Sequence, residues 1–234
     1  STASKSPNSA SARSAWRIAA ASRTTTLAIT DYANGARSVE VTPGASVWIT
    51  FSGGGTVLKA DKYDKATSTY KAGSVIATFA GPVVASTGSY TTSKVRIRDA
   101  SGPFSQTNIA WRGKIRFTPA VATGHAINYV MMEQYLRGVV PRESPSSWPI
   151  EALKAQAVAA RSYAFSSASA GSILWCDTHS QVYNGADDGT DSHEDAKTDQ
   201  AIAATANEFV VYGSTVVQTF FSSSSGGRTA NIED

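Results

Sequence analysis

The sequence of 234 residues predicts an α+β fold, with a β-rich N-terminal half, a helical C-terminal region and a terminal β-hairpin. Apolar and polar residues alternate in short runs through residues 27–117, which is the period of half-buried strands. Apolar residues recur at helical spacing before and after a proline-rich stretch at 141–149. Near the end, two runs at 208–212 and 215–221 flank a Gly213-Ser214 turn, which predicts the hairpin.

Composition is that of a globular protein, with 41% hydrophobic and 9% aromatic residues. We expect residues 1–14, rich in Ser and Ala, to form a linker or a disordered start. Residues 15–125 are expected to form a β-rich domain or subdomain, and residues 126–234 a region that carries the chemistry-bearing motifs. No apolar run approaches the roughly 20 residues that cross a bilayer. Ser1 stands in place of an initiator Met, so we expect any signal peptide to have been removed or left out.

Charge divides the chain into two unlike halves. Residues 1–125 carry 15 Lys and Arg against 5 Asp and Glu, whereas residues 126–234 carry 6 against 13. The basic half would attract an anionic polymer or contact the acidic half, the alternative being a solvated face. No nucleic-acid motif accompanies it, so nucleic acid is not an expected partner. Five cations at alternate positions of two candidate strands predict a basic stripe on one face, or else the water-facing side of a half-buried sheet: Arg96, Arg98, Arg112, Lys114 and Arg116.

The first strand is expected at Trp16-Arg17-Ile18, and a strand at Ala126–Val130 leads into the first helix. Pro141 and Pro145 are expected to end that helix, because proline lacks the N–H that a helix interior needs. Pro149 suits the first turn of the second helix, which then has Ser147 or Trp148 as its capping residue.

Glu143 is therefore predicted to lie in a stiff elbow between two helices. Apolar neighbours such as Val140 and Trp148 would remove water from its carboxyl group and raise its pKa, which a general acid needs at neutral pH. The alternative reading is a glutamate that caps the following helix or pairs with Arg137 or Arg142.

Three ordered segments resemble the SpoIID/LytB family of bacterial cell-wall proteins: Ile127 to Tyr163, Asp177 to Gly185, and Phe220 to Thr229. The resemblance covers the C-terminal half closely and the N-terminal half loosely. The family includes a sporulation lytic transglycosylase that cuts peptidoglycan glycan strands, and proteins described as enhancers of a cell-wall amidase. Its catalytic glutamate falls on Glu143, while Ser144 stands where many relatives have Met.

The resemblance implies a glycan-binding groove near Glu143. Arg161 would fix a carboxylate or a sugar hydroxyl, the alternative being a structural salt bridge. Gln181 and Tyr183 would contact a sugar through an amide and an aromatic ring, the alternative being core packing of Tyr183. The family motif implies further binding residues on the second helix and in a hydroxyl-rich strip: Lys154, Gln156, Ser222, Ser223, Ser224, Ser225, Gly226 and Arg228.

A long acidic loop at 171–195 contains the single cysteine, so an internal disulfide is excluded. Cys176 and His179 have a spacing that zinc sites use, and His193 would add a third ligand. A zinc site needs three or four converging protein ligands, and we expect no metal or cofactor. A nucleophilic Cys176 paired with His179 is a further alternative.

The resemblance and the placement of Glu143 together predict a lytic transglycosylase that cleaves MurNAc-GlcNAc strands and forms 1,6-anhydro-MurNAc ends. The alternative is a non-catalytic, wall-binding enhancer of an N-acetylmuramoyl-L-alanine amidase. The expected partners are glycan strands and such an amidase, in the extracellular space or wall of a bacterium. Relatives continue beyond the last motif, so we expect the chain to be truncated after Asp234.

Overall fold

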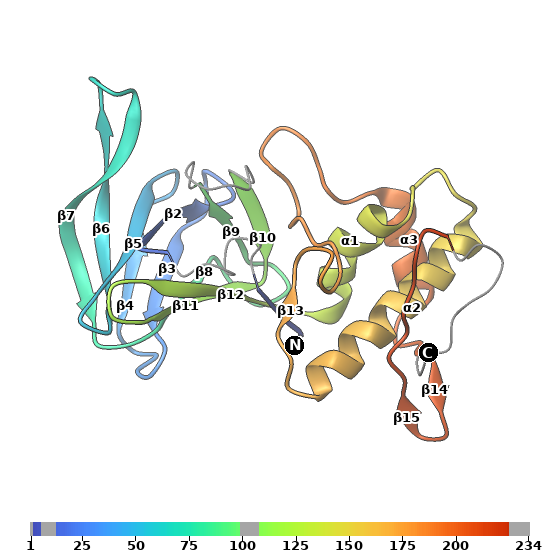
Figure 1. The fold of residues 1–234 in the computed structure, drawn as a ribbon. Coiled ribbons are helices and arrows are strands. Elements are labelled where there is room, and N and C mark those ends of the chain that lie inside the picture. The colour runs from blue at the N-terminus through green and yellow to red at the C-terminus, as the bar shows by residue number, and fades with distance from the viewer. Residues whose placement is uncertain (1, 6–12, 99–107, 225–234) are drawn as a thin grey trace.

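The computed structural model describes residues 2–5, 13–98 and 108–224, and it confirms a mixed, strand-rich α+β fold. Strands dominate the N-terminal part of the chain, and the three helices of the described residues lie together beside them (Figure 1).

One sheet has six strands, all in antiparallel pairs. Their spatial order is β10 (Ile109–Arg112), β9 (Lys94–Ile97), β2 (Ala15–Ala20), β5 (Ser46–Ser52), β6 (Gly55–Asp64) and β7 (Thr69–Phe79). The long β6–β7 hairpin extends beyond the rest of this sheet (Figure 1).

The second sheet has seven strands. Their order is β13 (Leu174–Trp175), β1 (Thr2–Lys5), β12 (Gly124–Val130), β11 (Lys114–Pro119), β8 (Val83–Ser86), β3 (Leu27–Asp31) and β4 (Ser38–Val41). Strand β1 lies inside the segment expected to be a linker or a disordered start. It pairs with β12 and β13 through its backbone groups, and a Ser- and Ala-rich composition does not reveal such pairing. Strand β12 crosses the boundary expected at residue 125.

The core of the strand-rich part lies between the two sheets. Trp16 on β2 is fully buried, and its ring centroid lies 5.6 Å from those of both Phe51 on β5 and Phe117 on β11. Aromatic pairs at this separation add to the stabilisation that burial gives. Since β12 follows β11 in the same sheet and runs directly into the first helix, this core anchors the start of the helical part.

The helices are α1 (Met132–Glu143), α2 (Ile150–Ser169) and α3 (Ala196–Ala204). The prediction that Pro141 ends the first helix is wrong. Pro141 lies in the last turn of α1, where only the carbonyl of Arg137 loses its donor, and Ser144 N–H still donates to Val140 O at 3.0 Å. The capping residue of α2 is Pro149, without a side-chain hydrogen bond, so the expectation of Ser147 or Trp148 is also wrong. None of these helices is long and apolar enough to cross a membrane.

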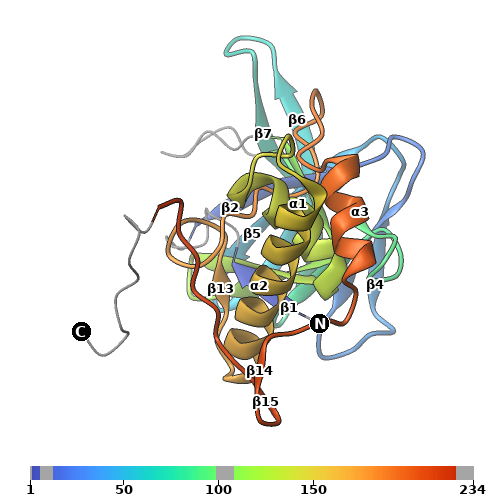
Figure 2. The ribbon, with the colours of Figure 1, turned by 90° about the vertical axis from the view of Figure 1, so that its right-hand side faces the viewer.

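The expected terminal hairpin is present, with shorter strands, as β14 (Val211–Tyr212) and β15 (Thr215–Val216). Gly213 turns it with a positive φ of 59°. The chain then runs back along α2, where Thr219 Oγ1 donates to Ala159 O at 2.6 Å (Figure 2).

Candidate functional site

Glu143 is the last residue of α1, and its side chain is half-buried. The backbone N–H of Val182 donates to its Oε1 at 2.7 Å. This contact joins the end of α1 to a loop 39 residues further along the chain. The carboxyl group is thus held in one orientation without being sealed from solvent.

Burial raises the pKa of the Glu143 carboxyl group, and the hydrogen bond from Val182 opposes that rise. Its place at the C-terminal end of a helix acts in the same direction as burial, because the partial negative charge there disfavours an anion. The structure does not support the alternative ion pairs: Arg142 is exposed, and Arg137 pairs with Asp199 at 2.5 Å. A carboxyl group that is protonated at higher pH than usual can serve as a general acid.

Two buried side chains hold Val182 in place. Gln181 has no exposed surface; its Nε2 donates to Ala160 O at 3.2 Å and its Oε1 accepts from Tyr135 Oη at 3.1 Å. Tyr183 is 1% exposed and packs edge-on against Tyr135, with ring centroids 4.8 Å apart. The structure therefore gives Gln181 and Tyr183 no surface for a sugar, and places them where they position the Val182 N–H.

Gly138 makes this packing possible. A Cβ added to Gly138 would lie 2.5 Å from Tyr183 Cε2 and 2.8 Å from Gly185 O. We expect Gly138→Ala to lower the stability by about 1–3 kcal/mol, because the core must shift to accept the methyl group. Thermal unfolding would measure the effect. Gly35→Ala is the matched control, since nothing lies within 4 Å of an added Cβ there; an unchanged melting temperature for Gly138→Ala would contradict this packing.

The structure uses Arg161 internally. Its side chain has no exposed surface, and its Nε donates to Glu133 Oε1 at 2.9 Å. It also donates to the carbonyls of Ile202 and Glu208, each at 3.2 Å. Arg161 therefore forms the structural salt bridge that was one of its two alternatives. Because its side chain has no exposed surface, it offers no contact to a substrate.

The other predicted binding residues lie on α2 and in the segment that follows the terminal hairpin. Lys154 Nζ donates to Glu151 Oε1 at 2.7 Å on the surface of α2, and Gln156 is half-buried. Ser222, Ser223 and Ser224 are exposed beyond the segment that runs along α2. The predictions for Ser225, Gly226 and Arg228 lie outside the described residues.

The prediction of a single basic stripe is wrong, because its residues belong to two different sheets. Arg96 and Arg112, on β9 and β10, pair with Asp187 and Glu194 of the acidic loop. These contacts span 91 and 82 residues of sequence. The basic half thus contacts the acidic half, and these pairs hold the part of the acidic loop that follows Val182.

Two of the three residues considered as zinc ligands, Cys176 and His179, have opposite surroundings. Cys176 is 1% exposed, and burial raises the pKa of its thiol well above the ordinary value. His179 is exposed and its Nδ1 lies 2.9 Å from Asp177 Oδ1. Within the described part of the chain, no three His, Cys, Asp or Glu side chains gather in a group that could hold a metal.

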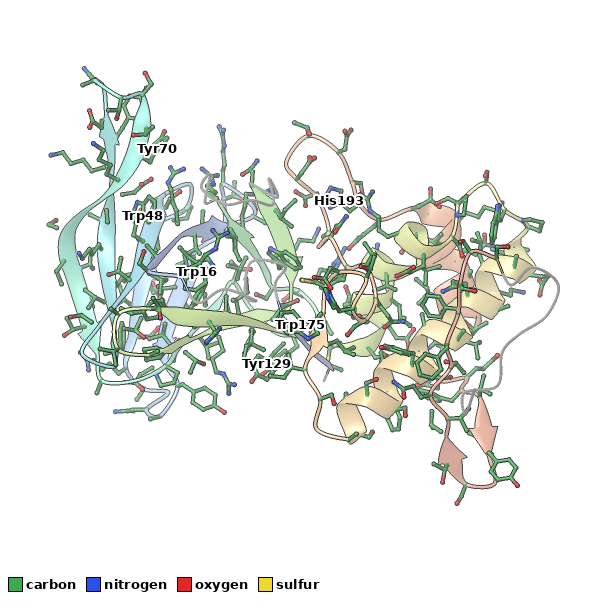
Figure 3. All side chains as sticks on the ribbon, in the orientation of Figure 1. Trp16, Trp48, Tyr70, Tyr129, Trp175 and His193 are labelled. Atoms are coloured by element: carbon green, nitrogen blue, oxygen red, sulfur yellow. The ribbon has the colours of Figure 1, made fainter. Side chains whose placement is uncertain are left out.

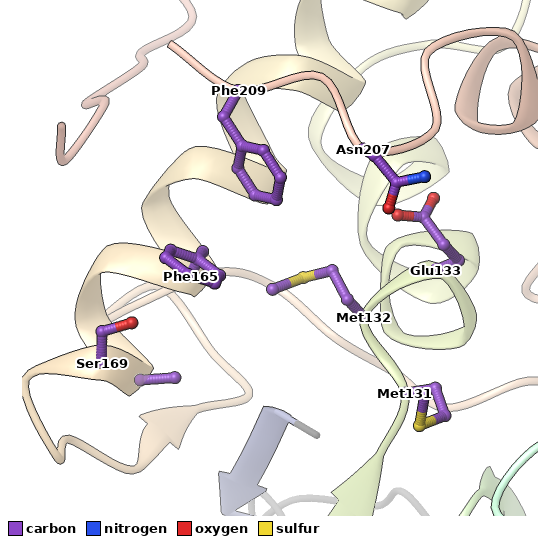
Figure 4. A pocket seen from close by; sticks show the side chains of 8 residues that line it. Met131, Met132, Glu133, Phe165, Ser169, Asn207 and Phe209 are labelled. Atoms are coloured by element: carbon purple, nitrogen blue, oxygen red, sulfur yellow. The ribbon is translucent and has the colours of Figure 1, made fainter. Parts of the chain in front are cut away.

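Two pockets that the sequence did not predict lie at the other end of α1. One, of about 410 Å³, is lined by apolar side chains including Met132, Phe165 and Phe209, with Glu133 at its wall (Figure 4). The second, of about 470 Å³, is lined by Glu133 and by residues of α1 and α3. Glu143 lines neither pocket. It lies ten residues after Glu133 along α1, which is a rise of about 15 Å.

Comparison with known proteins shows what this site resembles. The family described as "Stage II sporulation protein" (SpoIID) matches residues 122–212, which include α1, α2 and Val182. The chain is 38% identical over 136 residues to an uncharacterised protein of Brachyspira hyodysenteriae, a match that covers 56% of this chain and 36% of that protein. No solved structure matches the chain significantly.

Two further relatives have descriptive names. The "Amidase enhancer" of Bacillus subtilis is 37% identical over 94 residues, which are 40% of this chain and 12% of that protein. The "Stage II sporulation protein D" of Bacillus amyloliquefaciens is 32% identical over 125 residues, 47% of this chain and 36% of that protein. This chain therefore spans little more than a third, or less, of each of these relatives.

Proposed function

Because residues 122–212 of this chain belong to the SpoIID/LytB family, we propose that the protein is a peptidoglycan lytic transglycosylase with Glu143 as its general acid and base. The observation that carries the proposal is the state of Glu143: it is half-buried, its pKa is raised, and among the described residues an N–H orients it and no cation pairs with it. Its substrate is the glycan strand of the bacterial cell wall, and its place of action is outside the cell or in the wall.

The proposed reaction needs one carboxyl group. Protonated Glu143 gives its proton to the glycosidic oxygen as the bond from N-acetylmuramic acid to N-acetylglucosamine breaks through an oxocarbenium-like state. The resulting carboxylate then accepts the proton of the muramyl 6-hydroxyl, whose oxygen closes a 1,6-anhydro ring. Since the substrate supplies the nucleophile, no water enters the product and Glu143 ends the cycle protonated.

The raised pKa of Glu143 predicts a pH dependence. The first step needs the protonated acid, so kcat/KM is expected to fall as the pH rises through the pKa of Glu143, at a point above the ordinary value of 4.5. A pH profile of strand cleavage would measure it. Activity that rises continuously through this range would show that another group provides the proton.

The second candidate is a non-catalytic, wall-binding enhancer of an N-acetylmuramoyl-L-alanine amidase. The relative named "Amidase enhancer" favours it, with 37% identity over 94 residues. Under this reading, Glu143 stabilises the loop through Val182, and the partner amidase performs the chemistry.

One assay separates the candidates. Purified protein is incubated with glycan strands, and the products are identified by mass spectrometry. Anhydro ends support the transglycosylase, reducing ends indicate a hydrolase, and intact strands retained on the protein indicate a binding module. If the third outcome is found, adding an N-acetylmuramoyl-L-alanine amidase and measuring a faster release of stem peptides would support the enhancer.

A further inference from the structure

The outer face of the seven-stranded sheet carries cations placed between tyrosine rings. The Arg116 guanidinium lies 5.1 Å from the ring centre of Tyr32 and 4.9 Å from that of Tyr129. Lys114 Nζ lies 4.6 Å from the ring centre of Tyr90. Contacts at these distances are attractive cation–π interactions. We call these five residues the tyrosine ladder.

Strand alternation places the ladder on the outside. On β11, Ile115 and Phe117 point into the core, so Lys114 and Arg116 point away from it. Tyr129 is paired with Lys114 across β12 and β11 and shares their face. Tyr32 is 57% exposed and Tyr90 is 39% exposed. The rings therefore offer open surface to a ligand.

A fourth aromatic residue extends the ladder toward the helices. Arg116 on β11 is paired with Ile127 on β12, and Ile127 is paired with Lys5 on β1. Lys5 is in turn paired with Trp175 on β13, so Trp175 and Arg116 lie in the same cross-strand row of the sheet. Leu174 beside it is in the core, which puts Trp175 on the outer face. Tyr129 and Trp175 lie at the side of the sheet next to the helical part (Figure 3). From β3 to β13 the face extends five strand spacings, about 24 Å.

No acidic group of the described residues neutralises the charge of the ladder. Among the described residues, neither Lys114 nor Arg116 forms an ion pair with an acidic group, and Arg116 Nε is buried without a hydrogen-bond partner. The comparable cluster on the other sheet differs. There Arg17 lies 3.5 Å from the ring centre of Tyr70, but its guanidinium pairs with Asp61 at 2.6 Å.

We propose that the tyrosine ladder, extended by Trp175, is a binding surface for an acidic polysaccharide that lies across the strands. Aromatic rings pack against the apolar faces of sugar rings, and the two unpaired cations attract carboxylates spaced along the polymer. Among the side chains that the structure describes, two cations accompany four rings, which matches a chain with one charge for every second sugar. A nucleic acid carries a phosphate on every residue and needs more cations.

The peptide-free glycan of peptidoglycan has this spacing, because only its N-acetylmuramic acid carries a carboxylate. The choice of this glycan rests on the proposed function, whereas the surface itself does not. The ladder would hold a strand on the sheet from which β12 leads into α1, and so present the strand toward the helical part that bears Glu143.

Binding by Glu143→Gln protein to fluorescent peptide-free glycan strands tests the proposal without cleavage. Adding Tyr32→Ala or Arg116→Gln is expected to weaken binding about tenfold, and raised salt is expected to weaken it further. Tyr63→Ala is the matched control, since Tyr63 is 48% exposed on the other sheet. The melting temperature of each variant shows whether it is folded, and the exposed Tyr32 allows the test even if Arg116→Gln is unstable.

Several results would overturn the proposal. They are unchanged glycan binding in the folded Tyr32→Ala variant, equal losses in Tyr63→Ala, neutral chitin oligomers bound as tightly as the acidic strands, or a single-stranded oligonucleotide bound more tightly than they are. If glycan strands bind through the ladder but are never cleaved by the unmodified protein, the transglycosylase proposal is rejected and the binding-surface proposal is retained.

Discussion

Glu143→Gln is expected to reduce cleavage of glycan strands by about a thousandfold or more, because the amide can neither give nor accept the proton. The fold should survive, since the glutamine Oε1 can still accept the hydrogen bond from Val182 N–H. The rate of strand cleavage and the melting temperature, measured together, would separate a chemical loss from an unfolded protein.

Glu151→Gln is the matched control for this change. Its side chain is 76% exposed in the first turn of α2, where it pairs with Lys154. A surface pair of this kind contributes little to stability, and its loss should leave cleavage unchanged. If Glu143→Gln and Glu151→Gln were equally active, Glu143 would be architectural.

Glu133→Gln is expected to have the largest effect on stability. It would leave the Arg161 guanidinium, which has no exposed surface, without its charged partner in the core. Removing one member of a fully buried ion pair costs about 3–5 kcal/mol. Because the Glu133 side chain is 39% exposed, water screens part of the interaction, and we expect a loss of about 2–4 kcal/mol, which for a chain of this size lowers the melting temperature by roughly 5–10 °C. Calorimetric or spectroscopic melting would measure it.

Removing Arg161 instead of Glu133 should lower the stability less. Arg161→Met removes the buried charge and leaves Glu133, whose side chain is 39% exposed and can be hydrated. The double variant Glu133→Gln, Arg161→Met should therefore be more stable than Glu133→Gln alone. A double variant that lost the sum of both single effects would show that the two charges are not coupled.

The strand and helix classes followed from local pattern, but the pairing did not. Alternation predicted the β-rich character of residues 27–117 because half-buried strands leave a period of two in the sequence. Strand β1 left no such pattern, since its evidence is backbone pairing with β12 and β13. Pro141 could be part of α1 because it lies in the last turn, where a proline disrupts few helix hydrogen bonds. The sequence did not show that the helix ends only at Glu143.

The site was predictable where chemistry is local and not where it depends on folding. The sequence predicted the desolvation of the Glu143 carboxyl group, and burial does raise its pKa; its catalytic role is a proposal. It did not reveal that Gln181 and Tyr183 are buried around Val182, because residue type alone does not separate a sugar contact from a core contact. The pairs of Arg96 and Arg112 join residues far apart in sequence, and the charge difference between the halves was their one visible signal.

The central claim is that one carboxyl group passes a proton to the glycosidic oxygen and takes another from the sugar itself. The direct measurement is strand cleavage in oxygen-18 water, with mass analysis of the new ends. We predict 1,6-anhydro ends that contain no oxygen-18. Reducing ends that carry the heavy oxygen would contradict the account, because water would then be the nucleophile.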